Sequence, residues 1–320
     1  MRAVRVHQWG SAPALEELAE PVRRPGRSLV RMAAATVGHI DRTVWSGGFL
    51  RHPPLPYTPG VEAAGVVLAS DRFDVGQRVW LRGAGLGTQT DGTWCELIDA
   101  PDEALGPLPD RVGMALGSAF FSPCTSAWIA LHEVARLCSG ERVLVTGATG
   151  AVGSIAVQLA LEAGAVVSAV VTDASRAALL PRGVTAVAFD GTVSSVPDSV
   201  AADVLIDTVG GTLLAASLPR VVPVGRAVLI GYTGGNELTL NLAHFLQRDV
   251  RLLPLNMLRR EAAGRAVVPE LLSRLADGRL RLEVTSFALE RTATALGWIN
   301  DRGHRGRAVL VPGGCQVFDA

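Results

Sequence analysis

A buried strand, a tight glycine turn and an amphipathic helix follow one another without a break over residues 143–164, VLVTGATGAVGSIAVQLALEAG. Small residues in such a turn let backbone N–H groups and the positive end of the helix approach a pyrophosphate, while the helix packs close to the strand. The first glycine of the G-x-G-x-x-G pattern is replaced by Ala148, so a merely structural turn is the alternative. We expect a dinucleotide site that uses Gly150, Ala151, Val152 and Gly153.

The same stretch raises the question of a membrane span, because the run from Val143 to Leu161 carries no charged residue. Glycines interrupt this run, and its residue pattern changes from that of a strand to that of a helix. A continuous helix facing lipid would need neither feature. We therefore expect no association with a membrane.

The rhythm of the sequence changes near Phe120. Before it, short apolar or alternating segments are separated by Pro and Gly turns, which indicates a small, mainly β domain. After it, helices alternate with buried strands as far as about Leu252, which predicts βαβ units and a parallel sheet with helices on both faces. A helix, a strand, a short helix and a closing strand follow. At about 150 residues per domain, the 320 residues predict two domains.

Cofactor specificity should be decided at the end of the strand that follows the glycine turn, in VVSAVVTDASR. An acidic residue about 20 positions after the turn binds the ribose hydroxyls in NAD-binding proteins, and Asp173 has that spacing. The strand ends nearer Val171, however. Thr172, Ser175 and Arg176 follow it and could hold a 2′-phosphate. We expect NADPH rather than NADH, with Arg176 as a solvated residue at a helix start as the alternative.

The basic residues restrict the chemistry, because all 30 are Arg and none is Lys. The chain cannot form a Schiff base, complete a P-loop or a kinase site, or supply a Tyr-x-x-x-Lys proton relay. The segment TGATGAVG resembles the glycine turn of the short-chain dehydrogenases. Those enzymes depend on the Tyr-x-x-x-Lys relay, so this chain is not expected to be one of them. The basic residues are balanced by 30 acidic ones, so no charge pattern points to nucleic acid as a partner.

Cysteine usage favours a cytoplasmic protein with free thiols. The cysteines have neither C-x-x-C nor zinc-finger spacing, and no signal-peptide pattern follows Met1. Cys124 and Cys138 lie in apolar helical segments, and we expect both to be core thiols. The four cysteines are Cys95, Cys124, Cys138 and Cys315.

Nearly the whole chain resembles the medium-chain dehydrogenase/reductase superfamily, in its zinc-free quinone oxidoreductase and enoyl reductase branch. Several of the matching segments are common individually, but eight in the same order are specific. They are MRAVRVHQWG, IDRTVWSGGF, LPYTPGVEAAGVV, VGQRVW, VTGATGAVGSIAVQLA, DVLIDTVGG, GRAVLIGYTGG and GRAVLVP.

The resemblance implies an α/β fold in which a Rossmann doubly wound parallel sheet is inserted into a mainly β GroES-like domain. It places the GroES-like substrate domain at 1–118 and 254–320 and the Rossmann dinucleotide-binding domain at 119–253. It also implies a cleft at their junction that holds the nicotinamide, and a homodimer formed through an edge of the Rossmann sheet. We expect RAVLIGY and the segment near LTLNL to form that twofold interface.

The positions that bind catalytic zinc in other members of the superfamily are substituted. Gly38 replaces the cysteine and Val61 replaces the histidine, and Glu62 alone cannot hold zinc. The four-cysteine zinc lobe is also missing. A Lewis acid that polarises an alcohol oxygen is therefore not expected. This favours hydride transfer to an activated C=C bond or a quinone: an enone, a quinone or an enoyl thioester as a small-molecule substrate.

His39 and Asp41 are the candidate catalytic residues, because they are the ionisable pair in GHID, the segment expected to face the nicotinamide. His39 would titrate in a useful range, although a structural, hydrogen-bonded histidine is the alternative. Asp41 is expected to be structural or to orient the substrate. Some enoyl reductases have a tyrosine where Phe49 stands, so that donor is lost. Tyr57 sits in a proline-rich turn, and we expect it to pack against the domain junction.

The resemblance adds further cofactor contacts. Ser126 matches a position near the nicotinamide, and a crossover segment that includes Asn256 and Met257 usually has its backbone near the carboxamide. A third group follows the strand AVLIGY, whose carboxyl end should open onto the cofactor. This group is Gly231, Tyr232 and Thr233.

Two other functions stay open on the same fold. The chain could be a tailoring enzyme that acts on a polyketide-like intermediate, which the lost tyrosine and the unusual GHID segment suggest. It could also be a binding protein that responds to NADPH without catalysis.

Overall fold

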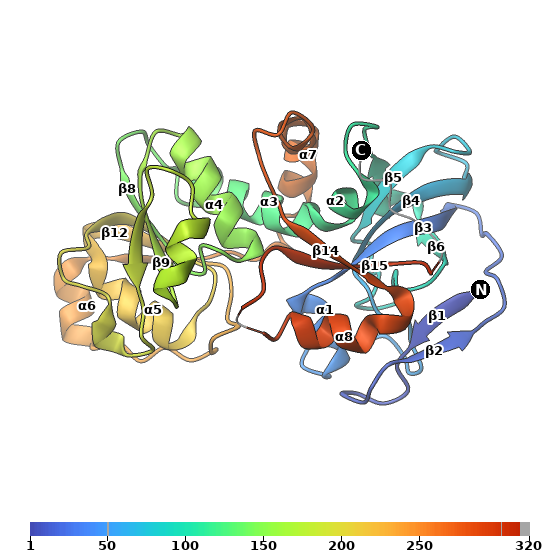
Figure 1. Ribbon diagram of the computed structural model, residues 1–320, viewed down its shortest axis with the longest axis horizontal. Coiled ribbons are helices and arrows are strands. Elements are labelled where there is room, and N and C mark those ends of the chain that lie inside the picture. The colour runs from blue at the N-terminus through green and yellow to red at the C-terminus, as the bar shows by residue number, and fades with distance from the viewer. Residues whose placement is uncertain (50, 302, 314–320) are drawn as a thin grey trace. The chain divides into compact units, whose positions relative to one another are not determined.

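The computed structural model describes residues 1–49, 51–301 and 303–313 (Figure 1). These residues form two compact units: Met1–Phe121 with the chain from Leu272 onward, and Ser122–Leu271. The family resemblance predicts that the inserted domain ends at residue 253, whereas the second unit runs on to Leu271. The boundary falls inside helix α7 (Glu261–Ala276), a continuous helix that the sequence places wholly after the inserted domain.

The second unit is built on a six-stranded sheet, and every pair of neighbouring strands is parallel. The strands β8 and β11 at its centre are short apolar runs that are almost wholly buried, as the sequence pattern predicts. Its order is β10-β9-β8-β11-β12-β13. The strands are β8 (Arg142–Val145), β9 (Val166–Val171), β10 (Thr185–Ala188), β11 (Ala202–Asp207), β12 (Val221–Leu229) and β13 (Arg251–Pro254).

Helices connect these strands. Figure 1 shows α4 (Ala151–Glu162) packed beside β8 and β9. The helix expected over SAWIALHEVARL is confirmed as α3 (Phe121–Ile129), which continues into a π-helical turn, Ala130–Val134. The helix expected over ASRAALLPRG is a short 3-10 helix, Ala174–Leu179. Pro181 and Gly183 follow it closely and do not allow an α-helix to extend. The remaining helices of this unit are α5 (Gly211–Ser217), α6 (Leu242–Arg248) and most of α7.

The first unit is a mainly antiparallel β structure. Its larger sheet has the order β14-β15-β3-β4-β5-β7, with β6 also paired to β3. The last strand of the chain lies antiparallel to β3, with Ala308 opposite Val37, so the carboxyl-terminal segment completes the sheet begun by the first hundred residues. The strands are β3 (Arg27–Val37), β4 (Glu62–Ala69), β5 (Arg78–Arg82), β6 (Leu97–Pro101), β7 (Leu105–Pro107), β14 (Val284–Ala288) and β15 (Arg307–Val311).

A separate hairpin opens the chain, with β1 (Arg2–Arg5) antiparallel to β2 (Ala14–Glu17). α1 (His39–Trp45) begins directly after β3. α2 (Met114–Ala119) packs on β3 and β4, and α8 (Thr292–Trp298) packs on β14 and β15. The expected α/β fold, a parallel Rossmann sheet together with a mainly β GroES-like domain, is confirmed.

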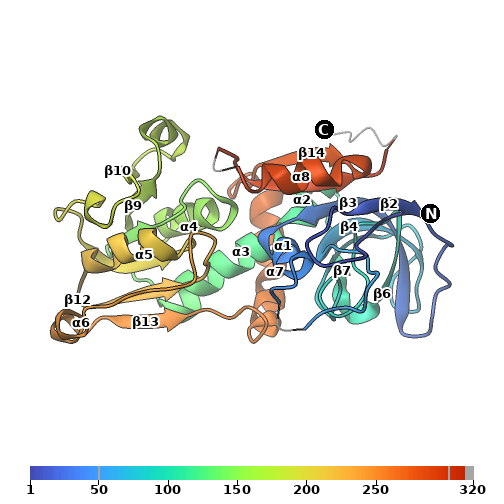
Figure 2. The ribbon, with the colours of Figure 1, turned by 90° about the horizontal axis from the view of Figure 1, so that it is seen from below.

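The strand expected at the dimer edge is not an edge strand. RAVLIGY belongs to β12, which pairs with β11 on one side and with β13 on the other, as Figure 2 shows for β12 and β13. LTLNL is not a strand. β13 was not predicted, because its four residues, RLLP, are too few to show a periodicity. The edges of the parallel sheet are β10 and β13.

One thiol also differs from expectation. Cys124 is buried, but Cys138 is exposed, because it lies in the turn between the end of the π-helical segment and β8 rather than on a helix. Cys315 lies outside the described residues. Across the ranges that the structure describes, no helix combines the length and the apolar character needed to cross a membrane.

Candidate active site

The glycine turn lies between β8 and α4, and it leaves no room for a side chain at Gly153. A Cβ at Gly153 would lie 2.1 Å from the carbonyl oxygen of Gly147. Gly150 is the N-cap of α4 and has extended backbone geometry, so the helix begins at Ala151. The first N–H groups of a helix have no partner within the helix. The turn therefore offers those of Ala151, Val152 and Gly153 to an anion, together with the positive end of the helix dipole.

A buried polar network, which the sequence analysis missed, fixes the base of this turn. The Thr146 hydroxyl donates to Oδ1 of Asp207 at 2.6 Å, and Oδ2 accepts the backbone N–H of Gly210 at 2.9 Å. The Thr208 hydroxyl donates to the carbonyl of Thr146 at 2.8 Å. Burial raises the pKa of Asp207, although these hydrogen bonds oppose the shift. The network ties the loop after β8 to the loop after β11.

The sequence holds one indication of this network, which is the acidic residue Asp207 at the end of the apolar run DVLID. The carboxyl ends of parallel strands meet at one edge of a sheet, so a polar side chain there can bond to the neighbouring loop. The sequence does not say which loop, because β8 and β11 become neighbours only in the folded sheet.

The residues expected to select the cofactor surround the same turn. The Nε of Arg176 donates to the Thr149 hydroxyl at 3.0 Å, so the guanidinium lies beside the glycine turn. Thr172 is exposed and directly follows β9. Asp173 caps the 3-10 helix by accepting the N–H of Ser175 at 2.7 Å, and this hydrogen bond holds the pKa of Asp173 below its usual range. The acidic residue is therefore engaged with its own backbone.

The other expected cofactor residues are in two groups. Gly231, Tyr232 and Thr233 follow β12, where the N–H of Ile230 donates to the carbonyl of Asp207 at 2.8 Å. They share the sheet edge of the glycine turn, and Tyr232 is exposed. Asn256 follows β13, and its Oδ1 accepts the N–H of Leu258 at 3.0 Å, so this side chain caps its own turn.

Met257 and Ser126 are the remaining expected cofactor residues. Ser126 is buried on α3. A Cβ at Gly264 of α7 would lie 3.4 Å from Cε of Met257 and 3.5 Å from Cβ of Thr125, the neighbour of Ser126. Met257, in the segment after β13, and Thr125 of α3 therefore both lie beside Gly264 of α7.

His39 and Asp41 belong to the first unit, on α1. Asp41 is buried, and its carboxyl accepts two backbone N–H groups, from Gly38 at 2.7 Å and from Val61 at 3.0 Å. Burial raises the pKa of Asp41 to about 7, and the hydrogen bond from Gly38 and the charge of Arg307 limit the rise. Asp41 thus holds the start of α1 to the segment that leads into β4.

A second carboxylate, Glu62, lies in the same region, and its ion pair was not predicted from the sequence. Glu62 is buried, and its Oε2 accepts from Nη2 of Arg307 at 2.6 Å, while its Oε1 lies 3.7 Å from Nε of Arg82. The Arg307 guanidinium also fills the space beside Gly38, since a Cβ at Gly38 would lie 3.2 Å from its Nη1. Arg307 stands in β15, far along the chain, so no local pattern could have paired it with Glu62.

His39 differs from expectation in its protonation. The residue exposes part of its surface, yet the groups packed around its ring desolvate it. This desolvation, together with the positive charges of Arg307 and Arg42 and the neighbouring ring of His304, lowers the pKa of His39 to about 4. The ring is therefore neutral near pH 7, outside the range that the sequence analysis expected it to titrate in.

Tyr57 packs in an apolar cluster of the first unit. It is buried against Val6 and Val44, with its ring 5.5 Å from that of Trp9. Its hydroxyl has no hydrogen-bond partner among the described atoms, and burial raises its pKa. Phe49 borders the same cluster.

No cluster of three or more His, Cys, Asp or Glu suited to a metal occurs in the described parts of the chain. At the two positions where the resemblance implies zinc ligands, Gly38 and Val61 supply backbone N–H groups, which donate to Asp41. The second unit thus carries an anion cradle, and the first unit separately carries a buried carboxyl cluster.

Two family models match the chain. Residues 24–110 match the alcohol dehydrogenase GroES-like domain, and residues 182–310 match the zinc-binding dehydrogenase model. Among curated proteins, the quinone oxidoreductase of Mus musculus is 31% identical over 259 residues, which cover 74% of this chain and 75% of that protein. The quinone oxidoreductase of Pongo abelii is 34% identical, but the match covers only 50% of this chain and 49% of that protein.

A polyketide synthase is also similar. One protein of the phenolphthiocerol/phthiocerol polyketide synthase of Mycobacterium tuberculosis is 31% identical over 267 residues, which cover 78% of this chain and 12% of that protein. Among solved structures, the quinone oxidoreductase of Thermus thermophilus, described with its NADPH complex, has a TM-score of 0.79 and 26% identity. That match covers 97% of this chain and all of the other (100%).

Proposed function

This chain belongs to the medium-chain dehydrogenase/reductase superfamily, in its quinone oxidoreductase branch, and on that premise we propose that it is a zinc-independent, NADPH-dependent reductase. Its substrate would be a small molecule with an activated C=C bond or a quinone: an enone, a quinone or an enoyl thioester. The observation that carries the proposal is the cradle at Gly153, where a Cβ would lie 2.1 Å from the backbone of Gly147.

The residues of the second unit fit a nicotinamide dinucleotide. The N–H groups of Ala151, Val152 and Gly153 would hold the pyrophosphate, since an anion at a helix start gains both hydrogen bonds and the dipole. The loops that carry Thr172 and Arg176 after β9, and Gly231, Tyr232 and Thr233 after β12, border the same sheet edge. When bound, the reduced nicotinamide supplies a hydride.

NADPH is favoured by two contacts at the turn. Arg176 lies beside Thr149, where its guanidinium could pair with a 2′-phosphate by charge-assisted hydrogen bonds. Asp173, the residue that could select NADH, already accepts a hydrogen bond from its own backbone at Ser175. The Thermus thermophilus relative is described with NADPH, which is consistent with this preference.

Zinc independence follows from the residue types. Gly38 and Val61 have no ligand atoms in their side chains, and the Arg307 guanidinium fills the space beside Gly38. A cation in that space would be repelled by Arg307. Asp41 instead joins the two segments through their N–H groups, so it acts as a positioning residue.

His39 is the proposed catalytic residue of the first unit. Its neutral ring, with a pKa lowered to about 4, could donate one hydrogen bond to the substrate oxygen on which negative charge develops. Asp41 would hold α1, and with it His39, in place. The proton for the α-carbon would come from water, because the carboxyl of Asp41 is buried and engaged with backbone groups.

A second candidate function is supported by the polyketide synthase match. On this reading the substrate is an enoyl thioester of a polyketide-like intermediate, and the enzyme is a tailoring reductase. The chemistry of hydride transfer is the same, and only the acceptor differs.

The test is the oxidation of NADPH, followed by its absorbance, with small enones, quinones and enoyl thioesters offered separately. Turnover of a free quinone or enone supports the first reading, whereas turnover of thioesters alone supports the second. Tight binding of NADPH with no turnover of any acceptor would make the chain a binding protein that responds to NADPH. If neither NADPH nor NADH binds, the proposal fails altogether.

A homodimer is part of the proposal, with β13 rather than β12 as the strand available at one edge of the parallel sheet. Its test is the molar mass in solution by light scattering. A cytoplasmic location stays a prediction from the sequence, to be checked by fractionation.

A further inference from the structure

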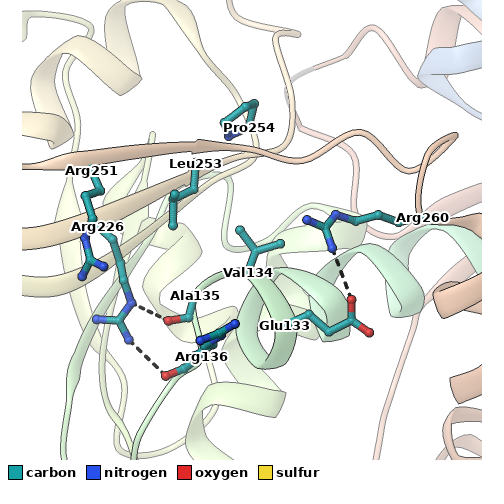
Figure 3. A pocket seen from close by; sticks show the side chains of 9 residues that line it. All are labelled: Glu133, Val134, Ala135, Arg136, Arg226, Arg251, Leu253, Pro254 and Arg260. Atoms are coloured by element: carbon teal, nitrogen blue, oxygen red, sulfur yellow. Dashed lines mark hydrogen bonds and ion pairs between the residues drawn. The ribbon is translucent and has the colours of Figure 1, made fainter.

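A cavity of about 470 Å³ lies within the second unit, away from the glycine turn. Figure 3 shows it between the π-helical turn and the strands β12 and β13. None of its residues belongs to the proposed cofactor cradle. It is lined by Glu133, Val134, Ala135, Arg136, Arg226, Arg251, Leu253, Pro254 and Arg260.

The lining of this cavity is strongly basic, with four arginines against one glutamate. Every basic residue of the chain is Arg, so the choice of Arg over Lys says nothing about a ligand. The gathering of four basic residues in one cavity is the informative feature. Two of the four are neutralised. Arg226 makes two hydrogen bonds to Glu141, at 2.8 and 2.7 Å, and Arg260 lies 3.3 Å from Glu133.

The other two, Arg136 and Arg251, have no carboxylate within 4 Å in the described part of the chain. Arg251 has one long hydrogen bond, 3.4 Å, to the carbonyl of Val224. It also stands directly beside Arg226 in the register of β12 and β13. Because Glu141 already neutralises Arg226, the charge that an anion would meet at this pair is that of Arg251.

The backbone of the wall is irregular where it presents Arg136. The π-helical turn Ala130–Val134 precedes it, and π-helical turns are frequent at functional sites. Arg136 itself has φ of 52°, a left-handed conformation that is unfavourable for a residue with a side chain. Its carbonyl accepts a hydrogen bond from Arg226 at 3.3 Å, which helps to hold this geometry. Such strain persists only where the surroundings maintain it.

We propose that this cavity binds a small molecule with two anionic groups, phosphate or carboxylate. Arg136 and Arg251 would supply the charge, because the planar guanidinium matches both groups in two-point geometry. Val134, Ala135, Leu253 and Pro254 would contact its apolar part. The volume suits a small metabolite, since ligand pockets span about 300–1,000 Å³. The site is separate from the cofactor cradle, so it does not depend on the proposed reaction.

The test uses the full chain saturated with NADPH. The bound NADPH occupies the cofactor cradle, so pyrophosphate that binds must do so elsewhere. Pyrophosphate and citrate are titrated separately by calorimetry, as the phosphate and the carboxylate probe. We expect at least one to bind at millimolar or lower concentration, and the better one identifies the source chemistry. Arg136→Gln and Arg251→Gln should each weaken it about tenfold. Arg182→Gln, at an exposed site outside the cavity, should leave the affinity unchanged.

Two results would overturn the proposal. One is that neither probe binds, or that binding is equal in the wild type and both cavity variants. The other is that the wild type is a dimer by light scattering, that Arg136→Gln or Arg251→Gln makes it monomeric, and that no probe binds the dimer. The arginines would then serve contact with a second copy of the chain. A parallel titration of NADPH into the wild type and both variants shows separately whether a substitution has impaired cofactor binding.

Discussion

The buried carboxyl of Asp41 accepts the backbone N–H of Val61 at 3.0 Å, and through its other oxygen it holds Gly38. These are the two positions where zinc-dependent relatives are expected to carry ligands. In this chain a side chain of α1 makes the connection between the same two segments. The connection is made inside the protein, where an unpaired carboxylate would be costly.

The first prediction concerns the pH dependence of stability. Burial raises the pKa of Asp41 to about 7, so between about pH 4 and pH 7 the folded chain keeps a proton that the unfolded chain has lost. The contribution of Asp41 therefore favours the folded state at low pH and declines as the pH rises to about 7. Asp41→Asn should remove this decline, and its destabilisation should be smaller at pH 8 than at pH 5, by about 2 kcal/mol.

The measurement is chemical denaturation followed by tryptophan fluorescence, since all tryptophans except Trp128 lie in the first unit. Asp71→Asn, at an exposed carboxylate of the same unit, is the control and should show no such difference. An equal effect of Asp41→Asn at both pH values would show that the carboxyl is ionised throughout.

The second prediction concerns the cradle. Gly153→Ala places a Cβ 2.1 Å from the carbonyl oxygen of Gly147, so the turn must move. Overpacking of this kind is destabilising by about 2 kcal/mol, and we expect NADPH binding to weaken about thirtyfold. Gly150→Ala should have a milder effect, because its Cβ would lie 3.2 Å from the same oxygen.

Gly297→Ala is the matched control, since nothing lies within 4 Å of that position in α8 and Ala favours a helix. Fluorescence titration with NADPH measures all three variants. Equal affinity of Gly153→Ala and wild type would mean that the turn does not hold the cofactor.

The third prediction concerns the choice of cofactor. Arg176→Gln should weaken NADPH binding about tenfold or more and leave NADH binding unchanged, because charge-assisted hydrogen bonds contribute about 1.5–3 kcal/mol. The ratio of the two dissociation constants is the measurement. Arg182→Gln, at an exposed position of the same unit, should leave that ratio unaltered. A parallel loss of both cofactors would place Arg176 at the pyrophosphate instead of at the ribose.

The fourth prediction concerns His39. With a pKa lowered to about 4, its ring is neutral between pH 6 and pH 8, so kcat should not follow its titration there. If the ring donates a hydrogen bond to the substrate, His39→Asn should lower kcat about tenfold. His7→Asn, at an exposed histidine of the same unit, is the control. A normal kcat in His39→Asn would leave His39 with a structural role only.

The fifth prediction concerns metal. Exhaustive dialysis against a chelator should leave NADPH oxidation unchanged, because Gly38 and Val61 lack ligand side chains and Arg307 repels a cation beside them. Elemental analysis of the active protein should find zinc well below one ion per chain. Stoichiometric zinc, together with activity that is lost on chelation and restored by zinc, would contradict this.

The fold class could be predicted because its signals are local. A strand, a glycine turn and a helix that follow one another over residues 143–164 specify their own connection, and the alternation of helices and strands continues the same pattern. Short elements such as β13 were missed because four residues show no periodicity. The exposure of Cys138 was missed because it depends on where a helix ends.

By itself, the sequence determined the order of the elements, the position of the glycine turn and the absence of lysine chemistry. Tertiary structure decided which polar groups meet: Thr146 with Asp207, Glu62 with Arg307, and Arg226 beside Arg251. The first two pairs join segments that are distant along the chain, and the third joins two strands that are consecutive in the chain. Partners of this kind are set by strand order and register, which a local pattern does not encode, and burial then makes their pairing matter.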